Sequence, residues 1–239
     1  MNLEKGLDRC LSFINCQIRA PEGQTPAYRD GEHRRAITLS RQAGSGAHVV
    51  AERLAELLQA QEPPGACPWT VFEKNLVEKV LEEHHLPSRV GKFMREDKIS
   101  EISDTMDELF GLHPPSWTLV HQTAESILHL AELGNVIIIG RGANIITGRL
   151  DYVFHVRLVG SIERRAQYLQ QQNPALTNKA ALTMIEQEDH GRKRYVRKYF
   201  DKDVEDPLLY HMVINTDLVP YEEAARVIAG AVAAKTIPA

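Results

Sequence analysis

Hydrophobic and polar positions follow two patterns along the chain. Short apolar runs rich in β-branched residues predict strands, and stretches with apolar residues three or four positions apart predict amphipathic helices. The expected strands are 36–40, 69–72, 135–139, 152–158 and 211–215. The expected helices are 3–18, 47–58, 74–85, 161–172, 177–200 and 220–234, together with two helical pieces within 91–134 that break at 111–115.

This alternation of strands and helices predicts a three-layer α/β/α fold around a mainly parallel, five-stranded sheet. The run Val136–Ile139 is wholly apolar, which is typical of a central strand covered on both faces. Residues 1–35 are expected to form an opening helix and a polar linker that contains proline and glycine. Residues 36–239 then form a single α/β domain.

Composition narrows the class of protein. The chain has 239 residues, of which 43% are hydrophobic and 25% charged, and these values exclude collagen-like and disordered chains. The longest strongly apolar run is too short to cross a bilayer, and Glu4 and Asp8 interrupt any secretory signal at the N-terminus. A net charge of −4 favours neither nucleic acid nor a membrane surface as a partner. We therefore expect a cytoplasmic protein.

The cysteines and histidines do not form a metal-binding pattern. Cys10, Cys16 and Cys67 are odd in number and widely spaced, which predicts free thiols in a reducing compartment. Since no CxxC or HExxH pattern occurs, we predict no metal site made by the protein alone. The opening helix is expected to pack on the core or on a second copy of the chain, the latter giving a homo-oligomer.

A glycine-rich turn joins the first strand of the α/β domain to the next helix. Gly44-Ser45-Gly46 can direct backbone N–H groups at an anion, and the following helix adds partial positive charge. Against the phosphate-loop pattern GxxxxGK[ST], Arg41 stands at the first glycine, Ala47 at the lysine and His48 at the Ser/Thr. The lysine cation and the Mg²⁺-binding hydroxyl are therefore absent. A phosphate cradle and a turn whose glycines only serve packing both remain open.

Three ordered segments resemble the cytidylate kinase-like family, whose members are relatives of bacterial cytidylate kinase. They are ITLSRQAGSG at 37–46, GNVIIIGRGAN at 134–144 and LYHMVINT at 209–216, and the resemblance covers about 36–232. The resemblance implies the phosphate-loop nucleoside-monophosphate kinase fold, with a helical acceptor lobe at about 74–134 and a lid at about 177–203. It also implies transfer of phosphate from ATP, with Mg²⁺, to a nucleoside monophosphate such as CMP or dCMP.

The same resemblance implies roles for single residues. Arg41 would replace the missing lysine and bind the nucleotide phosphates together with Gly44, Ser45, Gly46, Ala47 and His48. Arg141 would hold the acceptor phosphate, but Gly142 stands where cytidylate kinase has an aspartate, so selectivity for cytidine stays open. Arg165 and Asp189 would also bind the substrate, and Arg192 and Arg197 would act with Arg41 in catalysis. Asp189 and Arg192 match an Asp-x-x-Arg motif in the lid of cytidylate kinase.

Several features of the sequence favour other readings. The lid motif of cytidylate kinase has an arginine four residues before its aspartate, and this chain has Ile185 there. Arg197 lies five residues beyond Arg192, about 140° further round a helix, so both point the same way only if the helix bends. A nucleotide-binding protein without transfer activity and a kinase of another small phosphate acceptor are therefore the alternatives.

Overall fold

The computed structural model describes residues 12–13, 16, 35–73, 106 and 118–234. Its strands are β1 (Ala36–Arg41), β2 (Thr70–Phe72), β3 (Val136–Ile139), β4 (Val153–Val159) and β5 (Met212–Asn215). Its α-helices are α2 (Ala47–Gln59), α6 (Thr118–Leu133), α7 (Ala143–Ile146), α8 (Ile162–Gln172), α9 (Asn178–Phe200) and α10 (Tyr221–Ala234). A 3₁₀ turn, η2 (Pro207–Leu209), lies before β5.

The five strands form one parallel sheet in the order β2-β3-β1-β4-β5. In its centre, Ile37 of β1 pairs with Ile137 of β3 and with Phe154 of β4. The predicted parallel sheet is thus confirmed. Because all strands run the same way, their carboxyl ends meet at one edge, and the residues that directly follow β1, β2 and β3 lie there together.

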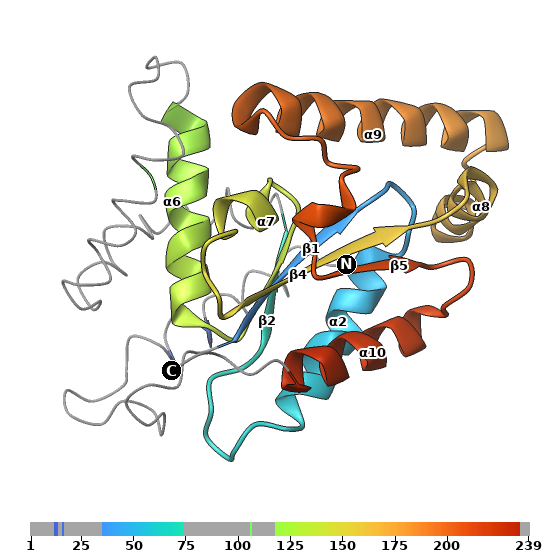
Figure 1. Ribbon diagram of the computed structural model, residues 1–239. Coiled ribbons are helices and arrows are strands. Elements are labelled where there is room, and N and C mark those ends of the chain that lie inside the picture. Colours follow the sequence, from blue (N-terminus) through green and yellow to red (C-terminus); the bar gives the residue numbers. More distant parts are fainter. Residues whose placement is uncertain (1–11, 14–15, 17–34, 74–105, 107–117, 235–239) are drawn as a thin grey trace.

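Helices cover both faces of the sheet, as the prediction of three layers requires. Figure 1 shows α2 and α10 side by side on one face, α6 and α7 on the opposite face, and α9 across the top. On the first face, Leu54 of α2 and Ile228 of α10 join one apolar cluster with Ile37 and Ile139. On the second face, Leu128 of α6 and Ile146 of α7 pack in a cluster with Val136 and Ile138.

Two short elements were not predicted from the sequence. α7 has four residues and η2 three, so neither is long enough to produce a hydrophobic period.

In both α8 and α9 the first helical residue follows a hydroxyl cap, since the side chains of Ser161 and Thr177 accept hydrogen bonds from backbone N–H groups. The predicted helix 74–85 and the first helical piece of 91–134 lie outside the described residues, apart from helical Met106.

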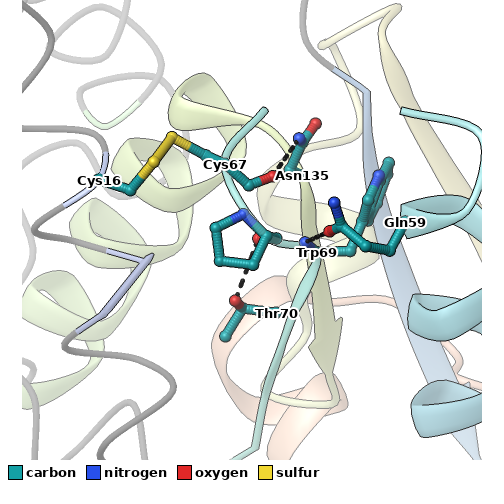
Figure 2. The surroundings of a disulfide bond; sticks show 7 residues. Cys16, Gln59, Cys67, Trp69, Thr70 and Asn135 are labelled. Carbon is teal, nitrogen blue, oxygen red and sulfur yellow. Dashed lines mark hydrogen bonds between the residues drawn. A yellow bond between two sulfur atoms is a disulfide. The ribbon is translucent and has the colours of Figure 1, made fainter. Parts of the chain in front are cut away.

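The expectation of free thiols is wrong for two of the three cysteines. Cys16 and Cys67, 51 positions apart, form a disulfide just before β2 (Figure 2). Phe13, one turn earlier in the chain, is fully buried with its ring edge-on to Phe72 at 5.7 Å between centroids. The Cys67 carbonyl accepts a hydrogen bond from Asn135 Nδ2 at 2.9 Å. Spacing along the sequence did not show this pairing because the two cysteines meet only through the tertiary fold.

The described residues test only some of the expectations about membrane spans, the opening helix and the acceptor lobe. None of its helices combines the length and apolarity that crossing a bilayer requires. Of the opening helix, Ser12, Phe13 and Cys16 are described and helical. The surface through which this helix would form a homo-oligomer, and most of the expected acceptor lobe, lie outside the described residues. α6, which with Met106 is the described part of that lobe, packs directly on the sheet.

Candidate functional site

The glycine-rich turn after β1 is held in one conformation by its neighbours. Gly44 and Gly46 have φ of 77° and 76°, in the left-handed region that favours glycine. A Cβ on Gly44 would lie 2.6 Å from the carbonyl oxygen of Arg165, and one on Gly46 would overlap the ring of Tyr221. Ser45 is buried and donates its hydroxyl to the Gln42 carbonyl at 2.8 Å. The turn is therefore closely packed, and it ends at the first residue of α2 as predicted.

A second turn after β3 places Arg141 beside the first turn. Gly140, Arg141 and Gly142 have φ of 82°, 59° and 69°, three left-handed residues in succession. A Cβ on Gly140 would overlap the guanidinium of Arg41, and one on Gly142 would lie 2.6 Å from the Phe200 ring. The glycines on either side of Arg141 thus admit a guanidinium and an aromatic ring at close range.

The end of β1 and the second turn, but not residues 44–46, line a pocket of about 570 Å³ at the carboxyl edge of the sheet. Its charged lining residues are Arg41, Glu73, Arg141, Glu188 and Arg192. Burial, together with repulsion from two of these arginines (Arg192 and Arg141), lowers the pKa of Arg41 to about 10. That side chain is still charged at neutral pH, so the pocket concentrates three guanidinium groups where a phosphate would meet them.

Asp189 of α9 connects the first turn to α8. Its Oδ1 accepts hydrogen bonds from the backbone N–H of Ala43 at 2.7 Å and from Arg192 at 2.9 Å. Its Oδ2 accepts one from Arg165 of α8 at 2.6 Å. The predicted lid helix is thus attached to the glycine-rich turn by a carboxylate.

Arg165 is buried beneath the loop. Its Nε donates to the Gly160 carbonyl at 3.0 Å, and its terminal nitrogen donates to the Ala43 carbonyl at 3.1 Å as well as to Asp189. The resemblance assigned Arg165 and Asp189 to substrate binding. In the described contacts, both side chains hydrogen-bond to the backbone of Ala43 in the loop. Neither is among the residues that line the pocket of Arg41, Arg141 and Arg192.

The two lid arginines have different surroundings. Arg192 lines the pocket and also pairs with Glu188, four residues before it on α9. Arg197 has a side chain that is 69% exposed and pairs with Asp201 at 3.5 Å. α9 runs without interruption from Asn178 to Phe200, so the angular separation predicted for these arginines keeps Arg197 out of the pocket.

His48 and Glu73 form an ion pair at the start of α2. Their Nδ1 and Oε1 atoms are 2.8 Å apart, and each side chain is 36% exposed. The hydrogen bond raises the pKa of His48 and lowers that of Glu73, so it favours the charged forms of both. Within the described ranges, no three His, Cys, Asp or Glu side chains gather into a metal site.

Sequence reasoning missed the buried side chain of Arg157, which lies beside the pocket that Ser40 and Arg41 line. Arg157 of β4 is 5% exposed and donates to the Ser40 hydroxyl at 3.0 Å, and the Tyr210 hydroxyl lies 3.2 Å from the same oxygen. The guanidinium of Arg157 is 5.7 Å from the centre of the Tyr210 ring. The available signal was an arginine in a strand whose other residues are mostly apolar, Val153–Val159.

A second, smaller pocket of about 360 Å³ opens beside Gly44. Tyr168 of α8 and Tyr221 of α10 line it, with their rings edge-on and 5.5 Å apart. Burial raises the pKa of both phenols, so both hydroxyls stay protonated at neutral pH. This pocket offers aromatic surface next to the glycine-rich turn.

Comparisons with known proteins address the fold and the family of the chain. The structure matches an uncharacterized protein from Eubacterium ventriosum with a TM-score of 0.63 and 21% identity, over 84% of this chain and 98% of that one. A shikimate kinase from Bacteroides thetaiotaomicron matches with a TM-score of 0.44 and 14% identity, over 83% and 98% of the two chains. No curated protein matches. The model of the cytidylate kinase-like family matches residues 36–218, so the chain belongs to that family.

Proposed function

We propose that the protein transfers the terminal phosphate of ATP to a nucleoside monophosphate, with CMP or dCMP as the first candidates. Membership of a kinase-like family supports phosphoryl transfer in general. The observation that carries the proposal is the pocket in which Arg41, Arg141 and Arg192 meet at the carboxyl edge of the sheet. Catalysis of phosphoryl transfer depends mainly on positioning and on stabilising negative charge, and three fixed guanidinium groups supply both.

The two turns divide the phosphates between them in this proposal. The turn 44–46 and Arg41 bind the donor phosphates, and the aromatic pocket of Tyr168 and Tyr221 beside Gly44 accepts the donor base. Arg141 binds the acceptor phosphate, and Arg192 neutralises the group in transfer. A monophosphate acceptor is already ionised at neutral pH, so the reaction needs no general base.

The choice of acceptor depends on the turn around Gly142. The Phe200 ring occupies the space that a side chain at position 142 would need, so the aspartate of cytidylate kinase does not fit here without a shift of that ring. A kinase of another small phosphate acceptor is therefore the alternative within the same reaction class. We also propose the cytoplasm as the place of the reaction, because ATP is the donor.

A panel of acceptors tests the proposal. CMP, dCMP, UMP, AMP and GMP are each incubated with Mg·ATP, and the diphosphate product is measured for the natural protein and for Arg41→Ala. We expect one acceptor to be converted and the rate to fall by 10²-fold or more in the variant, as when a positioned charge is lost. Arg226→Ala, which removes an exposed arginine of α10, serves as the matched control.

A nucleotide-binding protein without transfer activity is the second candidate. One specific observation favours it: Ile185, at the position of the first lid arginine of cytidylate kinase, is buried in an apolar cluster with Ala43 and Ala181. ATP binding without conversion of any acceptor would support this function and would contradict the kinase.

A further inference from the structure

A phosphate loop normally supplies a Ser or Thr hydroxyl to Mg²⁺, and His48 stands at that position in this chain. The histidine lies in the first turn of α2, directly after the loop. Its Nδ1 faces Glu73 Oε1 at 2.8 Å. Because a carboxylate only accepts hydrogen bonds, Nδ1 is the donor. The residue at the loop position that lacks the metal-binding hydroxyl therefore holds the carboxylate of Glu73, the residue that follows β2.

The chemistry of Glu73 fits a hard divalent cation. Mg²⁺ prefers oxygen ligands and is commonly held by one or two carboxylates together with substrate phosphates. Glu73 follows β2 directly and lines the pocket that contains Arg41 and Arg141. It is therefore placed where a metal-bound phosphate would also be in reach of the arginines.

The other acid of the pocket is less suited to this role. Among the described residues that line the pocket, Glu73 and Glu188 are the acidic ones. Glu188 is paired with Arg192, one turn along the same helix. The described hydrogen bond of Glu73 engages Oε1, and the second oxygen of the carboxylate stands outside that bond.

We propose that Glu73, oriented by His48, is the protein ligand for the divalent cation of the bound nucleotide. This inference rests on the proposed nucleotide binding at the glycine-rich turn. Glu73 contacts the metal, and His48 is a positioning residue that fixes the carboxylate. The arrangement is a replacement, from a different strand, for the hydroxyl that the loop lacks. When bound, the cation neutralises charge on the phosphates.

The test measures metal binding directly. Mn²⁺ is titrated into the protein saturated with a non-hydrolysable β,γ-imido analogue of ATP, and free Mn²⁺ is followed by electron paramagnetic resonance. We expect Glu73→Gln to weaken Mn²⁺ binding to the complex by about 10- to 100-fold. Glu52→Gln, which removes a carboxylate one turn beyond His48 on α2 and outside the pocket lining, should bind Mn²⁺ as the natural protein does.

Binding of the analogue in EDTA separates the two proposals. If Glu73→Gln binds the nucleotide and still holds Mn²⁺ as tightly as the natural protein, the metal inference is overturned while nucleotide binding stands. If the natural protein fails to bind the nucleotide, the proposed function fails and the inference fails with it. His48→Ala should weaken Mn²⁺ binding, and His48→Asn, whose amide can donate to the same oxygen, should restore it. A purely structural ion pair would change thermal stability without this pattern.

Discussion

Arg141 combines a strained backbone conformation with a place in the lining of the pocket. It has φ of 59°, a left-handed conformation that costs a residue with a Cβ about 1–2 kcal/mol. The conformation turns its side chain into the pocket that Arg41 and Arg192 share. A glycine at this position would adopt the same backbone without that cost, so the charge of Arg141 can be tested apart from its backbone conformation.

Replacing Arg141 by glycine should therefore separate stability from binding. We expect Arg141→Gly to leave the free energy of unfolding unchanged or to raise it by up to about 1 kcal/mol, since the strain is relieved. Acceptor binding should weaken by at least tenfold, because a charge-assisted contact to phosphate is lost. Urea denaturation and acceptor KM measure the two quantities. A variant that is clearly less stable would show that Arg141 mainly serves the fold.

At the scale of elements, the loop after β1 depends on α8 and α9. Asp189 joins the Ala43 backbone to Arg165 and Arg192, and Arg165 returns a hydrogen bond to the Ala43 carbonyl. The Arg165 side chain is only 9% exposed, whereas that of Asp189 is 27% exposed. The helix that the resemblance describes as a lid is therefore also a support for the loop.

The variant Asp189→Asn should weaken this support. It leaves the guanidinium of Arg165 largely buried and without its ionic partner, which we expect to cost about 1–2 kcal/mol once partial exposure is considered. Thermal unfolding measures the loss, and Glu186→Gln on the exposed face of α9 is the control. Nucleotide affinity should fall in the same variant because the loop becomes less rigid. Unchanged stability in Asp189→Asn would exclude the supporting role.

On the scale of the whole molecule, the disulfide connects the opening segment to the α/β domain. Cys16 and Cys67 close a loop 51 positions long, and Phe13 packs on Phe72 at the same place. In the chain-entropy model, closing a loop of this length stabilises the folded state by about 4 kcal/mol. Cys67 precedes β2 and Glu73 follows it, so the disulfide lies at the amino end of the strand whose carboxyl end reaches the candidate site.

Reduction of the disulfide should lower the thermal stability of the protein. We expect a dithiol reductant to lower the Tm by more than 5 °C, because the unfolded chain gains conformational entropy once the cross-link is removed. Without reductant, Cys16→Ser should have the same low Tm as the reduced natural protein. The Tm of Cys10→Ser should fall on addition of reductant, as that of the natural protein does. If the Tm of the natural protein is the same in both states, the disulfide does not stabilise the fold.

Local patterns in the sequence determined most of the fold. Short apolar runs predicted all five strands, and helical periodicity predicted α2, α6, α8, α9 and α10 to within a few residues. These predictions succeeded because hydrophobic periodicity and glycine turns act over neighbouring residues. The glycine-rich turn after β1 was recognised for the same reason, whereas Arg141 was singled out through the family resemblance, and in the structure it lines one pocket with Arg41.

Only the tertiary structure decided which partners the charged side chains and the cysteines contact. The sequence by itself determined the parallel α/β fold and the loop that lacks its lysine and hydroxyl. Only the folded chain showed that Asp189 binds the loop, that Arg197 points away from the pocket and that Cys16 meets Cys67. It also brought His48 of α2 to Glu73, 25 positions later. Such partners come from different elements, and no local pattern in the sequence encodes which of them will meet.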